Sequence, residues 1–140
     1  MKLTNDYIRG LVEGRGSFTF STNNIRKVPA FVIVMHERDK MLLEKVRDHL
    51  GLKNKIYVYG PYGNDGANRG KNTRLIVREF GPMKNVIIPF FYKRLVGNKR
   101  KQFEEWLEKI GSDPLVPESY KLYYKLYKSG YWDKNLKFLN

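Results

Sequence analysis

Residues 6–20 constrain the fold more than any other stretch, because their periodicity changes abruptly from that of a helix to that of a strand. Apolar residues at helical spacing predict a helix over about residues 6–15, with Asp6 as its N-cap. Gly10 and Gly14 lie one turn apart, so one side of this helix has no side-chain bulk and another backbone can approach it. Glycine costs about 1 kcal/mol relative to alanine inside a helix, so the pair indicates a packing role. Directly after the helix, polar and apolar residues alternate, which predicts a strand with two distinct faces.

The periodicity of the rest of the chain predicts more strands and helices. The expected segments are strands over 17–21 and 30–35, a helix over 39–50, strands over 55–59 and 73–80, an apolar segment over 86–88 that Pro89 interrupts, and helices over 99–110 and 120–126. Asp39 is expected to cap the second helix. A polar turn over 23–29 and a long hairpin loop over 60–72 separate the paired strands, and a helical extension is expected over about 112–140.

The composition is that of a basic protein with enough apolar residues for a core. Apolar residues make up 41% of the 140 residues, so we expect a single domain over 1–140. Lysine and arginine outnumber acidic residues 27 to 14, and the net charge of +13 is typical of nucleic-acid binders. The absence of cysteine excludes disulfides and Cys-based zinc sites. With no membrane-spanning run and no secretion signal, we expect an intracellular protein, cytoplasmic or organellar, that does not bind membranes.

The motif Ile8-Arg9-Gly10-Leu11-Val12-Glu13-Gly14-Arg15-Gly16, followed by Ser17-Phe18, resembles the signature of the LAGLIDADG homing endonucleases. Further local matches extend the resemblance over residues 7–110. It implies an α+β fold of order αββαββα with a saddle-shaped antiparallel sheet, followed here by extra C-terminal helices. Because only one motif helix is present, the resemblance also implies a homodimer that pairs through Gly10 and Gly14.

The eighth motif position departs from the family pattern. The resemblance implies a divalent metal held between acidic residues at this position of two motif helices, and the residue here is Arg15. Arginine is always protonated and only donates hydrogen bonds, so it cannot ligate Mg²⁺. Two arginines at the centre of a homodimer would repel a metal and attract a phosphate. We therefore predict that metal-dependent cleavage is lost, that Arg15 holds the nucleic-acid backbone, and that no cofactor is needed.

Two other residues near this position are candidates for cleavage. Glu13 projects roughly 200° away from Arg15 around the helix, so a packing or surface role is favoured over a metal ligand. Lys99 falls at the family's basic catalytic position, where it would polarise the scissile phosphate or its attacking water. An ordinary solvated lysine in a basic run explains Lys99 equally well. Without metal ligands, it would bind phosphate rather than hydrolyse it.

The resemblance assigns nucleic-acid recognition to the sheet, and a twisted antiparallel ribbon fits the major groove. Polar residues expected to line it are Ser17, Thr19, Ser21 and Asn23 from the first strand, with Arg74 and Arg78 from the fourth. Residues expected on hairpin tips, in contact with phosphates, are Arg26, Lys27, Arg69 and Lys71. An ordinary solvated strand face explains each residue singly, but six on one predicted face favour binding.

Duplex DNA is the first expected partner and structured RNA the second, since positive charge suits both. Three alternatives stay open. In the first, the chain is an active endonuclease that uses Mg²⁺ through other ligands. In the second, it is an RNA binder such as an intron maturase or a ribosome-associated protein. In the third, Gly10 and Gly14 serve pairing alone, which does not explain the net charge of +13.

Overall fold

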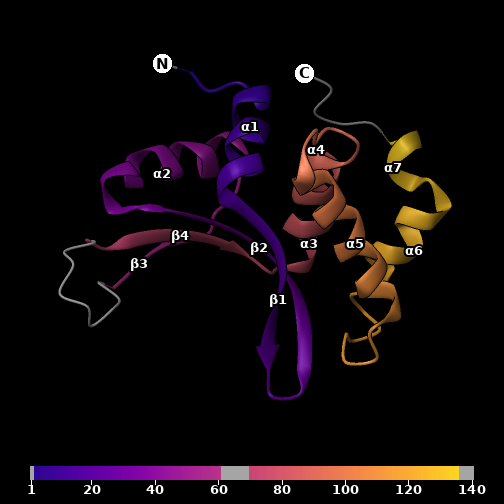
Figure 1. Cartoon of the computed structure of the whole chain (residues 1–140). Coiled ribbons are helices and arrows are strands. Elements are labelled where there is room, and N and C mark those ends of the chain that lie inside the picture. Colours follow the sequence, from indigo (N-terminus) through magenta and orange to yellow (C-terminus); the bar gives the residue numbers. More distant parts are fainter. Residues whose placement is uncertain (1, 61–69, 136–140) are drawn as a thin grey trace.

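The computed structural model describes residues 2–60 and 70–135 (Figure 1). Its elements are α1 (Asn5–Arg15), β1 (Gly16–Asn23), β2 (Arg26–His36), η1 (Glu37–Asp39), α2 (Lys40–His49), β3 (Ile56–Tyr59), β4 (Asn72–Val77), α3 (Phe80–Pro82), η2 (Met83–Ile87), α4 (Ile88–Phe91), α5 (Asn98–Ser112), α6 (Leu122–Ser129) and α7 (Tyr131–Lys134). Here η1 is a 3₁₀ turn and η2 is a π-helical segment. The predicted α+β class is confirmed, and the order from α1 to β4 is the expected one.

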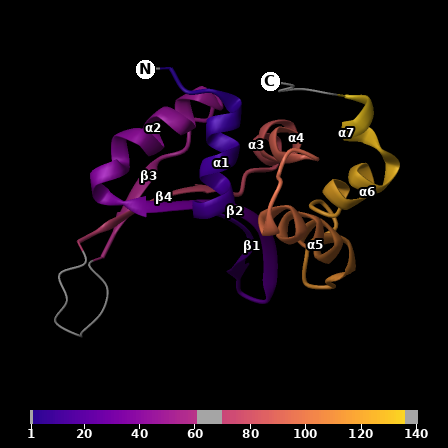
Figure 2. The same ribbon diagram turned by 45° about the horizontal axis from the view of Figure 1, so that its top comes forward.

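The four strands form one antiparallel sheet in the order β1-β2-β4-β3. In Figures 1 and 2, α1 and α2 lie on one side of this curved sheet and the remaining helices gather beside β1. Helix α5 covers the otherwise unpaired edge of β1. The Gln102 side chain accepts a hydrogen bond from the Phe18 amide at 3.4 Å, and the Trp106 indole donates to the Thr19 carbonyl at 2.7 Å. This edge is therefore protected from pairing with another chain.

An aromatic cluster joins β1 to the helices at the centre of the core. The ring of Phe18 lies 4.8–5.6 Å from the rings of Phe31, Phe91, Phe103 and Trp106. All five side chains are buried, and the rings meet tilted or edge to face, as aromatic quadrupoles prefer. The inward face predicted for the first strand and for residues 99–110 is confirmed.

The C-terminal extension is helical, as predicted, in the part that the structure describes. Tyr123 of α6 is fully buried, and its ring stacks on Phe80 at 5.3 Å. Asp133 of α7 accepts a hydrogen bond from the Tyr92 hydroxyl and pairs with Lys93, each at 2.8 Å. Among the described helices, none has the length and apolar character needed to cross a membrane.

The beginning of the motif helix differs from the prediction. The N-cap is Thr4, whose hydroxyl accepts a hydrogen bond from the Tyr7 amide at 3.1 Å. Asp6 lies in the first turn instead, and its carboxylate pairs with Arg9 at 3.2 Å. Asp39 does occupy the N-cap position of α2, but no cap hydrogen bond to its side chain is formed.

The segments after β4 also differ. The predicted strand over 73–80 ends at Val77, because Phe80 turns into α3 to stack on Tyr123. Pro89 does not interrupt the helical segment as predicted. Proline has no N–H to donate, and the turn before it widens so that the Ile88 amide donates to the Met83 carbonyl, five residues back. The turn predicted over 23–29 is also shorter, since β2 already begins at Arg26.

The junction between α1 and β1 gives a testable prediction. Gly16→Ala is expected to lower the free energy of unfolding by about 1–3 kcal/mol, because overpacking strains the neighbouring groups. A Cβ at Gly16 would lie 2.6 Å from Val12 Cγ1 and 3.1 Å from the Val12 carbonyl oxygen. Gly81→Ala is the matched control, since a Cβ there meets nothing within 4 Å. Urea unfolding followed by circular dichroism measures both, and equal stabilities would show that the junction tolerates a side chain.

Candidate nucleic-acid interface

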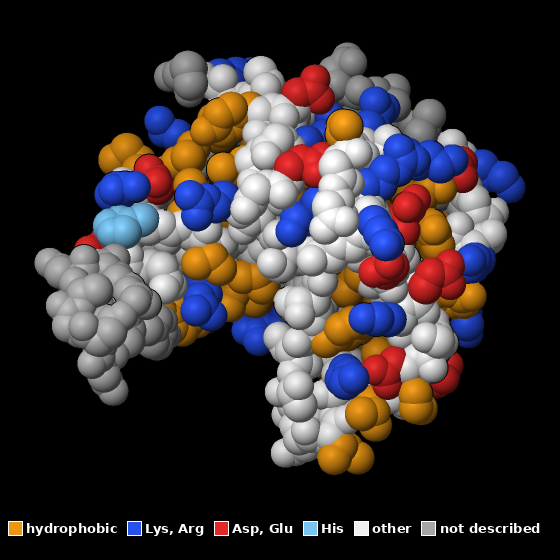
Figure 3. All heavy atoms as spheres, viewed as in Figure 1, with side chains coloured by type: hydrophobic (Ala, Val, Ile, Leu, Met, Phe, Trp, Pro, Cys, Tyr) orange, Lys and Arg blue, Asp and Glu red, His pale blue; other side chains and the backbone are white. Residues whose placement is uncertain are grey.

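The side of the sheet opposite α1 and α2 carries a continuous surface, which we call the free face. Directly paired residues of antiparallel strands point to the same side, so the strand register identifies its members. They are Ser17, Thr19, Ser21 and Asn23 of β1, Arg26, Val28, Val32, Val34 and His36 of β2, Asn72, Arg74 and Ile76 of β4, and Tyr57 and Tyr59 of β3. Ala30 of β2 points to the same side but is fully buried. Figure 3 shows the molecule hollowed on this side, with basic and hydrophobic side chains along the hollow.

Most of the predicted recognition residues gather on this face. Ser17, Thr19 and Asn23 are exposed, whereas the intervening Phe18 is buried. The guanidinium of Arg78, just after β4, donates to the hydroxyl of Ser21 on β1 at 3.2 Å. This bond spans the intervening strand β2, so the two predicted strands present their polar groups to the same space.

Arg74 is held in place by neighbours that the sequence analysis did not select. Its guanidinium lies 4.6 Å from the ring centre of Tyr59, and its Nε donates to the Asn72 side chain at 3.3 Å. The Lys55 ammonium lies 5.5 Å from the ring centre of Tyr57. The alternation of Tyr57 and Tyr59 with apolar residues was visible in the sequence, but their contact with Arg74 depends on the strand register.

The four basic residues predicted on hairpin tips are placed differently from one another. Arg26 is exposed at the start of β2, and Lys71 is exposed just before β4. Lys27 lies within β2, and its ammonium pairs with Asp113 at 2.9 Å, which holds the pKa of that carboxyl below its usual value. The phosphate contact of Lys27 stays a prediction. Arg69 lies outside the described residues.

The strand predicted over 30–35 as buried along most of its length has two faces. Phe31 and Ile33 are fully buried against the helices, but Val32 and Val34 are partly exposed on the free face. A continuous apolar run conceals this alternation, because both faces carry the same residue type.

The glycines of the motif helix form an open surface in the described protomer. Gly10 and Gly14 are exposed, and a Cβ at either would meet nothing within 4 Å. Arg15, one residue further on, is also exposed. It lines a shallow pocket with Val34, His36, Gly70, Lys71 and Asn72, at the edge of the free face. Arg15 and Lys71 therefore bring two positive charges to the end of the motif helix.

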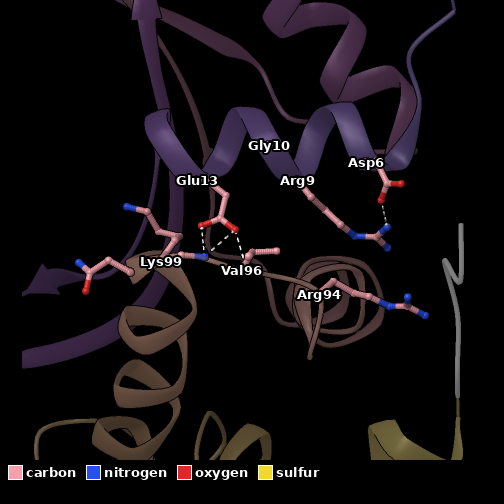
Figure 4. Close-up of a pocket in the computed structure, with 9 residues that line it drawn as sticks. Asp6, Arg9, Gly10, Glu13, Arg94, Val96 and Lys99 are labelled. Atoms are coloured by element: carbon pink, nitrogen blue, oxygen red, sulfur yellow. Dashed lines mark hydrogen bonds and ion pairs between the residues drawn. The ribbon is translucent and has the colours of Figure 1, made fainter.

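Glu13 connects the motif helix to the start of α5. Its carboxylate accepts hydrogen bonds from the backbone amides of Val96 and Gly97, the latter at 3.2 Å (Figure 4). These amides precede α5, so the carboxylate satisfies backbone donors and complements the positive end of the helix dipole. In the structure, Glu13 thus has the packing role that its sequence position favours. Lys99 lies beside Glu13 and donates to Gln102 at 3.2 Å, and its catalytic role stays a prediction.

The buried Arg9 fixes the other side of the motif helix. Its Nε donates to the Phe90 carbonyl at 3.0 Å, and its guanidinium lies 4.5 Å from the centre of the Phe90 ring. Burial lowers the pKa of Arg9, and the hydrogen bond to Asp6 opposes that shift. Arg9 and Glu13 together fix the motif helix against the segment that leads from α4 to α5.

The described residues do not fit the metal site that the family resemblance implies. The eighth motif position offers only the hydrogen-bond donors of Arg15, and Glu13 is turned towards the amides of Val96 and Gly97.

The cap on α5 gives a second prediction. Glu13→Ala is expected to lower the free energy of unfolding by about 1 kcal/mol, as loss of a capping side chain does. Glu105→Ala is the matched control, because Glu105 is exposed on α5 and lies 3.9 Å from Lys101 in a surface pair of small energy. Urea unfolding of both variants measures the difference. A Glu13 variant as stable as the control would show that the cap is dispensable.

Comparison with known proteins agrees with this geometry. The family model described as LAGLIDADG endonuclease matches residues 8–110. A curated relative, the "Probable intron-encoded DNA endonuclease 1" of Mycosarcoma maydis, is 42% identical over 57 residues, which are 39% of this chain and 21% of that protein.

Three solved structures share the fold. The LAGLIDADG homing endonuclease I-GzeII in complex with its DNA target has a TM-score of 0.62 and 23% identity, over 93% of this chain and 44% of that one. I-LtrWI bound to target DNA has a TM-score of 0.59 and 30% identity, over 76% and 36% of the two chains. The homing endonuclease I-TnaI has a TM-score of 0.60 and 23% identity, over 100% and 92%.

This chain therefore spans less than half of I-GzeII and of I-LtrWI, but nearly all of the I-TnaI chain. The family model covers most of the motif helix, the whole sheet and most of α5. The resemblance drawn from the motif is confirmed: this chain belongs to the LAGLIDADG endonuclease family.

Proposed function

We propose that this protein binds duplex DNA as a homodimer through the free face of its sheet, and that it has lost metal-dependent cleavage. The free face is the observation that carries the proposal. It presents strand hydroxyls and the Arg74 side chain, the neighbouring Arg78 reaches over it to Ser21, and the described residues of this face include no acidic side chain. A net charge of +13 adds long-range attraction to a polyanion.

The shape of the free face favours DNA over RNA. A two-stranded antiparallel ribbon enters the major groove of B-DNA, where arginine can pair bidentately with guanine and asparagine with adenine. The major groove of an RNA helix is too deep and narrow for such a ribbon. Tyr59 and Asn72 already orient the Arg74 side chain in the unbound protein, so less conformational entropy is lost when it contacts DNA. Arg26, at the hairpin end of this surface, and Lys71, beside it, suit phosphate contacts.

The homodimer is supported by the open glycine surface of α1. A helix face without side chains is rarely left bare in water, and the described protomer places nothing near Gly10 or Gly14. A second motif helix packed there would bring the two free faces side by side. The two Arg15 side chains would then approach each other beside the DNA backbone.

Loss of cleavage rests on Arg15. A hydrolytic metal site requires oxygen ligands near the scissile phosphate, and arginine supplies only donors. The nearby Lys71 adds a second positive charge, and this arrangement suits a bound phosphate. We infer that the end of the motif helix holds the DNA backbone without cutting it. An active enzyme would need Mg²⁺ ligands from elsewhere.

Binding to a random duplex pool and to folded RNAs, with the salt dependence recorded, tests the DNA proposal. We expect selection of a near-palindromic duplex. Arg74→Ala and Arg78→Ala are each expected to weaken binding about 10- to 100-fold, the range for a lost bidentate base contact. Lys71→Ala should weaken all sequences alike and reduce the salt slope by about one.

Lys125→Ala is the matched control, since Lys125 is exposed on α6, away from the free face. It should bind like the unmodified protein. A preference for folded RNA with little retention on duplex DNA would contradict the proposal and favour the maturase or ribosome-associated interpretation.

Incubation of the unmodified protein with the selected duplex and Mg²⁺ or Mn²⁺ tests the loss of cleavage, and we expect no cut product. Without metal, Arg15→Asp should weaken DNA binding about fivefold or more and lower the salt slope, because a cation near the DNA backbone becomes an anion. Lys125→Asp makes the same charge change elsewhere and serves as the control. Metal-dependent double-strand breaks by the unmodified protein would overturn the assignment of Arg15.

A further inference from the structure

The free face contains an apolar strip, formed by Val32, Val34 and Ile76, that the proposed contacts of its polar residues do not explain. Val32 is paired directly with Ile76, and Val34 is the next residue of β2 on the same face. All three side chains are partly exposed. They occupy the two central strands of the sheet, β2 and β4.

The strip is not needed for the core. The alternate residues Phe31, Ile33 and Val77 are completely buried on the opposite side of the same strands. Antiparallel sheets with one solvated face usually carry polar residues there. Leaving apolar surface in water costs about 25 cal/mol per Å², so a partner that covers the strip is bound more favourably.

The surroundings of the strip specify a polyanionic partner. Ser17 and Thr19 border it on β1, while Arg74 borders it on β4 and stacks on Tyr59. Arg78 crosses from β4 to Ser21 nearby. The described free face carries no acidic side chain, which favours nucleic acid over a typical protein partner. An apolar strip within a cationic face suits a nucleic acid that carries an apolar group on its base edges.

We propose that Val32, Val34 and Ile76 recognise the 5-methyl groups of pyrimidines, chiefly thymine, in the major groove. This inference rests on the proposed binding of duplex DNA. The thymine methyl is the apolar group that the four base pairs present in the major groove, and aliphatic side chains pack against it. The 5-methyl group of a methylated cytosine occupies the same position of the ring and suits the same contact. RNA, which carries uracil, lacks this group.

The spacing of the strip predicts where the methyl groups lie. Outward residues of one strand are about 6.6–6.8 Å apart, twice the rise per strand residue. Successive bases of one DNA strand are about 3.4 Å apart. When β2 follows the groove, Val32 and Val34 therefore reach positions roughly two base pairs apart. Ile76, on the neighbouring strand, broadens the contact around Val32.

The test compares one selected duplex with its exact sequence made with deoxyuridine in place of thymidine. Base pairing is preserved and only methyl groups are removed. Burial of one methyl group corresponds to about a fourfold change in affinity, so loss of two or three is expected to weaken binding at least tenfold. Single thymidine-to-deoxyuridine replacements then locate the contacts, which should lie about two base pairs apart in each half-site.

A variant pair assigns the effect to the strip. Val32→Thr combined with Ile76→Thr keeps β-branched residues on both strands but removes apolar surface, so the preference of this protein for the thymidine duplex should fall severalfold, with the remaining preference due to Val34. Val58→Thr is the matched control. Val58 is 46% exposed on β3 and pairs with the buried Thr73, on the side opposite the free face. The Val58→Thr protein should prefer the thymidine duplex as strongly as the unmodified protein does.

The outcomes separate this inference from the proposed function. Tight binding of the unmodified protein to both duplexes, with no preference for thymine, would overturn the methyl contact and leave DNA binding standing. Failure to bind either duplex would overturn both proposals. Thymine preference retained in full by the double variant would move the contact away from Val32 and Ile76 and overturn the assignment.

Discussion

The direct passage from α1 into β1 is the constraint on which the rest of the structure depends. No loop separates the last helical residue, Arg15, from the first strand residue, Gly16. The strand can leave the helix at this angle only because position 16 has no Cβ, which would meet Val12. A rigid junction of this kind fixes where every later group of the motif lies. It sets Arg15 at the edge of the sheet, and it turns Glu13 towards the start of α5.

Helix α5 connects the motif to the sheet through both polar and apolar contacts. Its start is capped by Glu13, and Gln102 and Trp106 bond to the backbone of β1. The same helix buries Phe103 against Phe18. The edge strand is thereby held on both its backbone and its inner face, which leaves the opposite face of the sheet as the surface available to a partner.

The free face combines two physical effects that act at different ranges. Its cations attract a polyanion over about a Debye length and do not distinguish sequences. Its hydroxyls, arginines and apolar strip act only in contact, where donor, acceptor and methyl positions differ between base pairs. At the end of the motif helix, Arg15 occupies the position where the family resemblance leads one to expect an acidic residue. In the proposed function, the protein therefore keeps its affinity for DNA and its recognition of base pairs but does not hydrolyse the DNA backbone.

The sequence by itself determined the order of elements from α1 to β4, the two faces of β1 and the departure at Arg15, because periodicity and residue chemistry are local properties. It led to an error where a distant contact competed with local preference, since Phe80 leaves the predicted strand to stack on Tyr123. Thr4 and Asp6 lie close enough for either to be chosen as the cap. Only the tertiary structure decided the strand register, which brings Tyr59 under Arg74 and sets Val32 beside Ile76. Register depends on pairing between residues far apart in the chain, and a run with apolar side chains on both faces, such as 30–35, contains no local signal for it.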